Sequence, residues 1–132
     1  PTITGWSEIS TSGTYDEATY PVTPDSIGAI EQTWTLTFSD ATNFDVVGDT
    51  VGSVGSGSIG GGDFAPDNPD FSSNPFFTLA DAGWGGTWAA GETITVTTHP
   101  AAYPAWLKQI VPPGANSLSA NSVRFAISGE SA

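Results

Sequence analysis

Two amino acids that often mark chemistry are missing from the sequence, which contains neither cysteine nor methionine. Without cysteine the chain has no disulfide, no thiolate nucleophile and no thiolate metal ligand, so ordinary packing must hold the fold. Its 132 residues and 13.5 kDa suit one domain rather than two. Because methionine is absent, we expect that an initiator was removed before Pro1 or that the sequence is part of a longer chain.

Basic residues are nearly absent. Lys108 and Arg124 stand against 14 carboxylates, which gives a formal net charge of −12 and an isoelectric point near 4.1. Two cations cannot neutralise a row of phosphates, so we expect neither nucleic-acid binding through a basic face nor attraction to an anionic membrane. No apolar run approaches the roughly 20 residues that cross a bilayer. Such a surface repels its own copies and favours a partner with a basic face.

Helical periodicity is also missing, whereas strand periodicity is plain. Between residues 31 and 38 apolar side chains alternate with threonine, which places Trp34, Leu36 and Phe38 on one face of a strand. The same alternation predicts strands at 92–98, with Ile94 and Val96 inward, and at 122–128, with Val123, Phe125 and Ile127 inward.

Weaker strand patterns fill the gaps. They cover 2–9, 14–22, 44–47, 50–54 and 106–111, with the first two expected to pair, a tight turn at Gly48-Asp49 and a single helical turn near 79–83. Seven or eight short strands predict an all-β fold over 1–132, a single-domain antiparallel β-sandwich or small β-barrel. Residues 1–24 fit either an extended N-terminal arm lying on a neighbouring subunit or an edge hairpin of the domain.

Residues 52–75 are expected to form a long irregular loop rich in glycine, proline and aspartate. The first part, 52–62, is almost entirely glycine and serine, and 63–75 is rich in proline, aspartate and asparagine. Gly55 to Gly60 fits the Gly-x-Gly-x-x-Gly spacing of dinucleotide sites, but no helix can begin after it, so we favour a flexible loop. Phe64 and Phe71 suit an ordered segment that lies against a surface.

The candidate catalytic and metal-binding side chains are mainly carboxylates, together with a single histidine. Asp63, Asp67 and Asp70, with Asn68, offer oxygen ligands for Ca²⁺, although Asx turns before prolines explain the same residues. His99 is the sole histidine and ends a predicted strand, where we favour a hydrogen bond to a loop carbonyl over a role as a catalytic base. No carboxylate pair stands out in an apolar setting. We predict no catalytic residue, no resident metal and no cofactor.

Aromatic residues supply the strongest candidate for a contact surface. Trp84, Trp88, Tyr103 and Trp106 cluster among glycines and alanines, which let an indole ring pack closely against backbone. Three interpretations remain open: core residues, an interface with a protein partner, and a flat platform for sugar rings. The predicted partner-binding residues are Trp84, Trp88, Tyr103, Trp106, Phe64 and Phe71.

Part of the sequence resembles known proteins. The segment 84–115, which reads WGGTWAAGETITVTTHPAAYPAWLKQIVPPGA, is similar to segments of uncharacterised structural proteins of tailed bacteriophages and prophages, as are WTLTF at 34–38 and DFAPDNP at 63–69. The resemblance covers about residues 31–132. It implies a virion component, a small β-rich protein of the capsid surface, the tail or a fibre, and it assigns no catalytic residue.

We therefore expect a non-enzymatic virion structural protein, most specifically a capsid decoration or cement protein that binds the major capsid protein. A phage tail or fibre component and a secreted carbohydrate-binding or adhesion module are the alternatives. Exposed, coplanar aromatic rings would favour sugar binding, whereas rings buried in the core or under a neighbour would favour the virion role. We expect a homo-oligomer such as a trimer, located on the virion, or an extracellular protein under the sugar-binding alternative.

Overall fold

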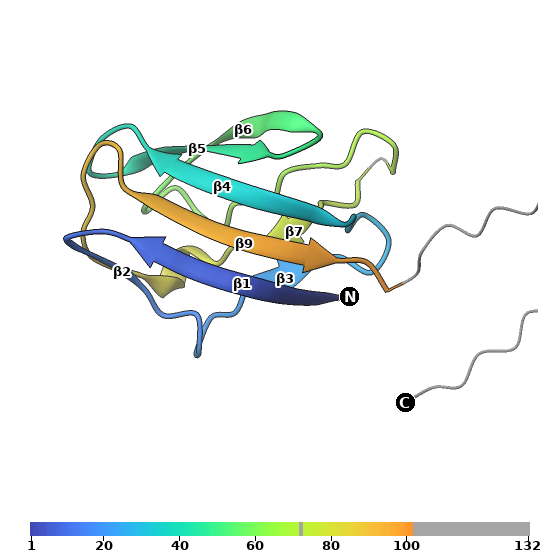
Figure 1. The fold of residues 1–132 in the computed structure, drawn as a ribbon, viewed down its shortest axis with the longest axis horizontal. Helices are drawn as coiled ribbons and strands as arrows, with labels where there is room; N and C mark the ends of the chain where they lie inside the picture. The colour runs from blue at the N-terminus through green and yellow to red at the C-terminus, as the bar shows by residue number, and fades with distance from the viewer. Residues whose placement is uncertain (72, 102–132) are drawn as a thin grey trace, which may run out of the picture.

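The computed structural model describes residues 1–71 and 73–101 (Figure 1). Every strand pair in this part of the chain is antiparallel, so the predicted all-β fold is confirmed. A 3-10 turn, η1 at Asp81–Gly83, falls within the helical turn predicted at 79–83. The strands predicted at 106–111 and 122–128 lie outside the described residues, as do Tyr103 and Trp106.

A five-stranded sheet, the main sheet, forms one layer. Its strand order is β1 (Thr2–Ile9), β9 (Thr93–His99), β4 (Gln32–Phe38), β5 (Asn43–Gly48) and β6 (Gly52–Ser58). Among residues 1–71 and 73–101, strands β1 and β6 are its two edges, and these five strands form an open sheet rather than a barrel. The predicted pairing of the strands on either side of Gly48-Asp49 is confirmed as β5–β6, but the turn lies at residues 49–51, because Gly48 pairs with Gly52.

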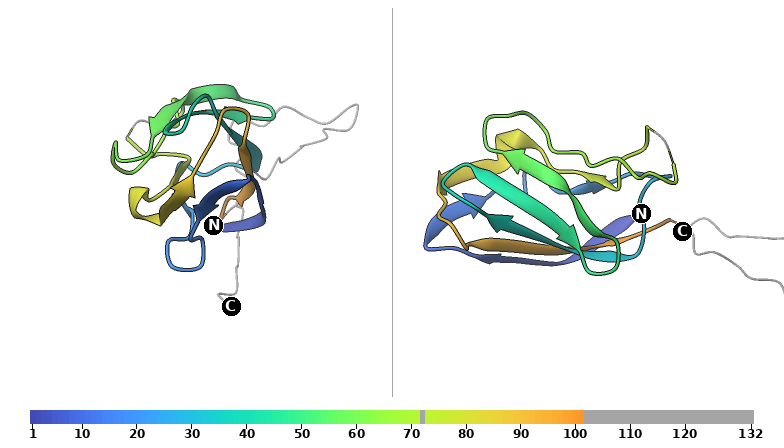
Figure 2. Two further views of the ribbon diagram at one scale, coloured as in Figure 1. Left: turned by 90° about the vertical axis from the view of Figure 1, so that its left-hand side faces the viewer. Right: turned by 90° about the horizontal axis from the view of Figure 1, so that it is seen from above.

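The facing layer consists of two short strand pairs. Strand β2 (Ser12–Tyr15) pairs with β8 (Trp84–Thr87), and β3 (Thr23–Pro24) pairs with β7 (Phe77–Thr78). Isolated bridges join Phe64 to Leu79 and Asp67 to Pro75 beside these pairs. Two views at right angles show the short pairs lying against one face of the main sheet (Figure 2), so the described residues form a β-sandwich.

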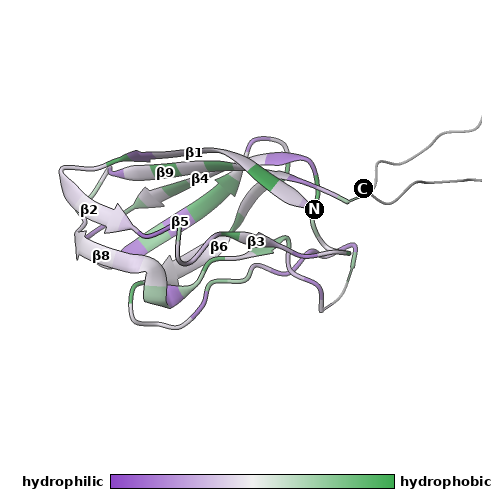
Figure 3. Ribbon diagram, turned by 90° about the horizontal axis from the view of Figure 1, so that it is seen from below, coloured by the Kyte–Doolittle hydropathy of each residue, from purple (hydrophilic) through white to green (hydrophobic). Residues whose placement is uncertain are grey.

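The core lies between the two layers. Trp34, Leu36 and Phe38 alternate with threonines along β4, and all three side chains are buried, as the period of two predicts. Hydrophobic positions recur along β4 and β9 (Figure 3), where Ile94 and Val96 are buried in the same way. The remaining buried apolar side chains of the core cluster are Tyr15, Val22, Phe44, Val46, Phe76, Phe77, Leu79 and Trp88.

The first strands differ from the prediction. Residues 2–9 do not pair with 14–22, because β1 pairs with β9 in the main sheet while β2 pairs with β8 in the facing layer. Residues 1–24 are therefore neither an extended arm nor a hairpin, although β1 is an edge strand. A register shift after Thr4, where Gly5 has a φ of 65°, brings the Trp6 ring to 5.3 Å from that of Tyr15. The packing of Trp6 against the core ties β1 to its own domain.

The predicted loop at 52–75 is wrong in its first part. Residues 52–58 form β6, whose small side chains leave room for the rings beneath it. A Cβ at Gly57 would lie 2.4 Å from Cζ of Phe44 and 2.9 Å from Cδ2 of Phe64. The β5–β6 register shifts between Val46 and Val47, which leaves Val54 as the extra residue of a bulge, packed against the core. Residues 52–58 can therefore form an edge strand because Gly57 leaves room for these rings, although their sequence shows no alternation of apolar and polar side chains that would predict a strand.

Candidate functional site

The described part of the predicted aromatic surface belongs to the core. Trp88 is 1% exposed and stacks on Phe38, with ring centroids 4.3 Å apart and planes 9° apart. Trp84 is partly buried, and its ring stands at 90° to that of Trp88. The prediction of Trp88 as a partner-binding residue is therefore wrong. These two rings are neither coplanar nor exposed, so they do not form a sugar platform.

Gly13 explains why the Trp88 ring can be buried. A Cβ at Gly13 would lie 2.3 Å from Cδ2 of Trp88, so the indole packs directly on the β2 backbone. The prediction gave this role to the glycines and alanines next to the tryptophans in the sequence, whereas the glycine under the Trp88 ring is Gly13 of β2. The Nε1 atom of Trp88 is buried without a hydrogen-bond partner among the described residues. This cost is offset by the packing of its ring on Phe38 and Trp84.

The two predicted phenylalanine contacts have different surroundings. Phe64 is partly buried, and its ring lies 5.6 Å from that of Phe44. Phe71 is 46% exposed, so its ring is available at the surface of the chain. Tyr103 and Trp106, the other two predicted contacts, lie outside the described residues. Of the described candidates, Phe71 therefore has the largest share of its side chain in solvent.

Two of the residues predicted as Ca²⁺ ligands, Asp63 and Asn68, bind backbone groups of the domain. The Asp63 carboxylate accepts a 2.9 Å hydrogen bond from the backbone N–H of Asp81. Asn68 is buried, donates to the carbonyl of Gly28 at 2.8 Å and accepts from the N–H of Asp70 at 3.0 Å. The described residues hold no group of three or more His, Cys, Asp or Glu side chains that suits a metal ion. The Asx-turn explanation is confirmed for Asn68.

Other carboxylates also bind backbone N–H groups. Asp40 accepts from the side-chain amide of Asn43 and from the backbone N–H groups of Thr42 and Asn43, and these bonds hold the pKa of Asp40 far below its usual value. Similar bonds lower the pKa of Asp25, through Gly28 and Ile27, and that of Glu92, through Thr11 and Ala89. Backbone donors therefore stabilise negative charge in a region whose sequence, 1–101, contains no lysine or arginine.

His99 joins three segments at the point where the chain leaves the main sheet. Its Nδ1 atom lies 2.8 Å from Oε1 of Glu31, and its Nε2 atom lies 2.7 Å from Oγ1 of Thr4. The predicted bond to a loop carbonyl is wrong, because the partners are a carboxylate and a hydroxyl. This order of acid, imidazole and hydroxyl matches a catalytic triad, yet these residues line neither of the two hollows described next. We interpret these contacts as structural, because they link β1, β9 and the segment before β4.

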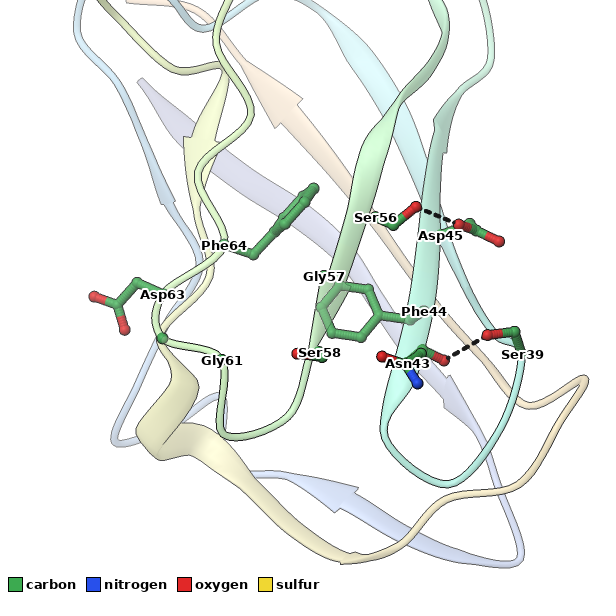
Figure 4. A pocket seen from close by; sticks show the side chains of 11 residues that line it. Ser39, Asn43, Phe44, Asp45, Ser56, Gly57, Ser58, Gly61, Asp63 and Phe64 are labelled. Carbon is green, nitrogen blue, oxygen red and sulfur yellow. Dashed lines mark hydrogen bonds between the residues drawn. The ribbon is translucent and has the colours of Figure 1, made fainter.

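A polar hollow of about 520 Å³ opens between the β5–β6 hairpin and the loop that follows it (Figure 4). Asp45 and Ser56 face each other across the hairpin, and the Ser56 hydroxyl donates to the Asp45 carboxylate at 2.6 Å. The rings of Phe44 and Phe64 form its apolar wall, and Asp63 lines it from the loop. Carboxylate and hydroxyl oxygens beside aromatic rings suit a neutral polyhydroxy ligand and repel an anion.

A second, apolar hollow of about 360 Å³ lies near the start of β6. Ile30, Val51, Val54 and Phe76 supply its apolar walls, and Asp67, Asn68, Pro69 and Asp70 contribute from the loop opposite. Val51 is 43% exposed. This apolar hollow can therefore accept an apolar side chain that has a positively charged group next to it.

The sequence pattern predicts neither hollow, because it extends the strand at 50–54 no further and assigns the rest of β6 to the irregular loop at 52–75. Regular pairing from the turn would set Asp45 opposite Gly55, and the bulge at Val54 is what sets Asp45 opposite Ser56 beside the polar hollow. The Thr4–His99–Glu31 contacts gave no local signal, since they depend on the pairing of β1 with β9.

Comparisons with protein-family models, curated proteins and solved structures each gave no match. Among the described residues, no helix is long and apolar enough to cross a membrane.

Proposed function

We propose that the chain is a non-enzymatic structural protein of a bacteriophage virion, and that it decorates the capsid by binding the major capsid protein. The observation that carries the proposal is the distribution of charge. All carboxylates except that of Glu130 lie in residues 1–101, whereas Lys108 and Arg124 both follow this region. A β-sandwich with such a surface stays dispersed through mutual repulsion of its copies and associates with a basic face of a partner. The resemblance to phage structural proteins supports the same role.

The packing of the tryptophans supports this function over a platform for sugars. Trp84 and Trp88 stabilise the domain by contacts with Phe38 and with each other, as a rigid structural module requires. In the described part of the chain, β1 and β6 are the edges of the main sheet, and they offer main-chain donors and acceptors to which a partner can add a strand. We further propose a homo-oligomer such as a trimer, in which apolar or main-chain contacts outweigh the repulsion between carboxylates. Light scattering of the purified full chain tests this directly.

The test is to isolate particles of the phage or prophage that encodes the chain and to count its copies by quantitative mass spectrometry. Capsid decoration predicts a copy number set by capsid symmetry and retention on heads separated from tails. Recombinant full chain should also bind particles that lack it, and less tightly as salt rises, because salt screens charge. Retention on tails alone would instead support a tail or fibre component. Absence of the chain from washed particles would overturn the virion role.

The polar hollow favours a second candidate, a secreted carbohydrate-binding or adhesion module. Under this alternative, the full chain should bind an oligosaccharide saturably on a glycan array, and Asp45→Ala should weaken that binding at least about tenfold, the loss of one charged hydrogen bond. Thr37→Ala, on the exposed part of β4, is the matched control and should leave binding unchanged. Failure of every glycan to bind would remove the alternative without affecting the particle experiment.

A further inference from the structure

The apolar hollow lies where the chain leaves the main sheet. At the end of β9, Thr98 pairs with Gln32, and the Thr98 hydroxyl donates to the carbonyl of Ile30 at 2.8 Å. Ile30 is itself a wall of the apolar hollow. The next residue, His99, is held to Glu31. The chain therefore continues beyond residue 101 from a point beside the apolar hollow.

The chemistry of the apolar hollow specifies its occupant. Apolar walls require apolar side chains, and Asp67 and Asp70 on the loop side favour a cation nearby. A second copy of the 1–101 region is a poor occupant, because it brings the same carboxylates and contains no lysine or arginine. The cations that the chain itself possesses are Lys108 and Arg124, and Lys108 is flanked by the apolar residues of the sequence Trp106-Leu-Lys-Gln-Ile-Val111.

We propose that the apolar hollow is an intramolecular docking site for the segment 106–111 of the same chain. Apolar residues of the segment would enter between Val51, Val54 and Phe76, and Lys108 would face Asp67 and Asp70. The segment begins a few residues after His99, and an extended chain covers roughly 3.3 Å per residue, so it can reach the apolar hollow of its own domain. Strand β6 is a sheet edge in the described part of the chain, and its main-chain groups lie beside this site.

The scarcity of cations provides a direct test with trypsin, which cleaves after lysine and arginine. Lys108 and Arg124 are the two target residues in the full chain, so cleavage at Arg124 serves as an internal reference. We expect the ratio of cleavage at Lys108 to cleavage at Arg124 to rise at least about tenfold in Val51→Ser/Asp67→Asn/Asp70→Asn, since proteolysis follows the population of the undocked state. Asp45→Asn removes a carboxylate at the polar hollow and should leave the ratio unchanged.

Circular dichroism checks that each variant remains folded. A ratio that is equal in the wild-type chain and in the folded triple variant would overturn the proposal. Protection of Lys108 that disappears on dilution would also overturn it, because the segment would then dock on a neighbouring copy.

A crosslink provides a second measurement that does not depend on proteolysis. The chain contains no cysteine, so Asp70→Cys combined with Lys108→Cys creates a single possible intramolecular pair. With oxidised glutathione as the oxidant, which accepts the two electrons of the two thiols, we expect a monomeric disulfide whose yield is independent of protein concentration. Thr37→Cys with Lys108→Cys is the control, because Thr37 is at the opposite end of β4 from Gln32. Equal yields from the two pairs, or disulfide-linked dimers alone, would overturn intramolecular docking.

Discussion

The main sheet and the facing layer are held together by different means. In the central strands of the main sheet, β4 and β9, threonines alternate with large apolar residues, and the two strands pair without a register shift. In the facing layer, strands of two to four residues carry little alternation. Their position depends instead on close approach at Gly13 and on carboxylates, such as those of Asp25 and Asp63, that bind loop N–H groups. The central strands of the main sheet are thus determined by the alternation of buried and exposed side chains. The facing layer is held in place by close packing at a glycine and by hydrogen bonds from backbone N–H groups to carboxylates.

The largest effect should follow from removing a large side chain of the main sheet. Trp34 is fully buried, and its Nε1 donates to the Thr98 hydroxyl at 2.9 Å. Trp34→Ala should lower the free energy of unfolding by about 3–5 kcal/mol, because it leaves a cavity between the layers. Denaturant unfolding of the purified chain measures this loss. Trp34→Phe is the control and should lose less, and equal losses for the two variants would contradict a cost set by ring volume.

A smaller effect should follow from adding a methyl group to the facing layer. Gly13→Ala places a Cβ in contact with the Trp88 ring, and we expect a loss of about 1–3 kcal/mol from overpacking. Gly60→Ala is the contrast, since Gly60 has a φ of 79° and open space around it. It should cost about 1 kcal/mol through backbone strain alone. Near-UV circular dichroism of the tryptophans should change for Gly13→Ala and not for Gly60→Ala; the reverse would refute the role of Gly13.

Tyr15 takes part in both core packing and loop hydrogen bonding, because its ring is in the core and its hydroxyl binds a loop carbonyl. It donates to the carbonyl of Ala80 at 3.0 Å, and burial raises the pKa of Tyr15 to about 12. Tyr15→Phe should cost about 1 kcal/mol at neutral pH. Because the folded-state pKa lies above the unfolded value, wild-type stability should fall between about pH 10 and 12. Tyr15→Phe should flatten this part of the stability curve, and an unchanged slope would contradict the assignment.

The smallest effect is expected at an exposed carboxylate, and it should depend on pH. The pKa of Asp40 is lowered by hydrogen bonds to Asn43 and Thr42, so its ionised form stabilises the fold. This contribution is present above the usual aspartate pKa and is lost as pH falls below that range toward the lowered value. Asp40→Asn should therefore lower the melting temperature slightly at pH 7 and converge with the wild type in acid. Thr37→Asn is the control, and a pH-independent difference for Asp40→Asn would disprove the cause.

The sequence predicted the main sheet well where side chains alternate. Strands at 31–38 and 92–98 and the hairpin near Gly48 needed only the period of two and turn chemistry, both of which are local. The facing layer was harder to predict because its strands are short and its contacts distant. Nothing near Gly13 indicates that Trp88 will lie on it, and the glycines of 52–58 are typical of a loop as much as of an edge strand.

The candidate site was less predictable than the fold. The clustering of aromatic residues indicates which rings matter for packing or contact, but whether Trp88 is buried or exposed depends on the layer that covers it. The two hollows arise between β6 and a later loop, so no motif in either segment alone could reveal them. By contrast, the partition of charge between residues 1–101 and the two later cations is visible in the sequence itself.

The pairing of Thr2 with His99 determines how the domain would respond to mechanical load. Hydrogen bonds between antiparallel strands run perpendicular to the strands. A pulling force applied at these two residues, which lie together at one end of the sheet, would load the bonds between β1 and β9 one after another, as in a zipper. The domain would thus yield by peeling at low force, beginning at the His99 contacts with Thr4 and Glu31. A force applied across the two layers of the sandwich, rather than at Thr2 and His99, would not load the hydrogen bonds between β1 and β9.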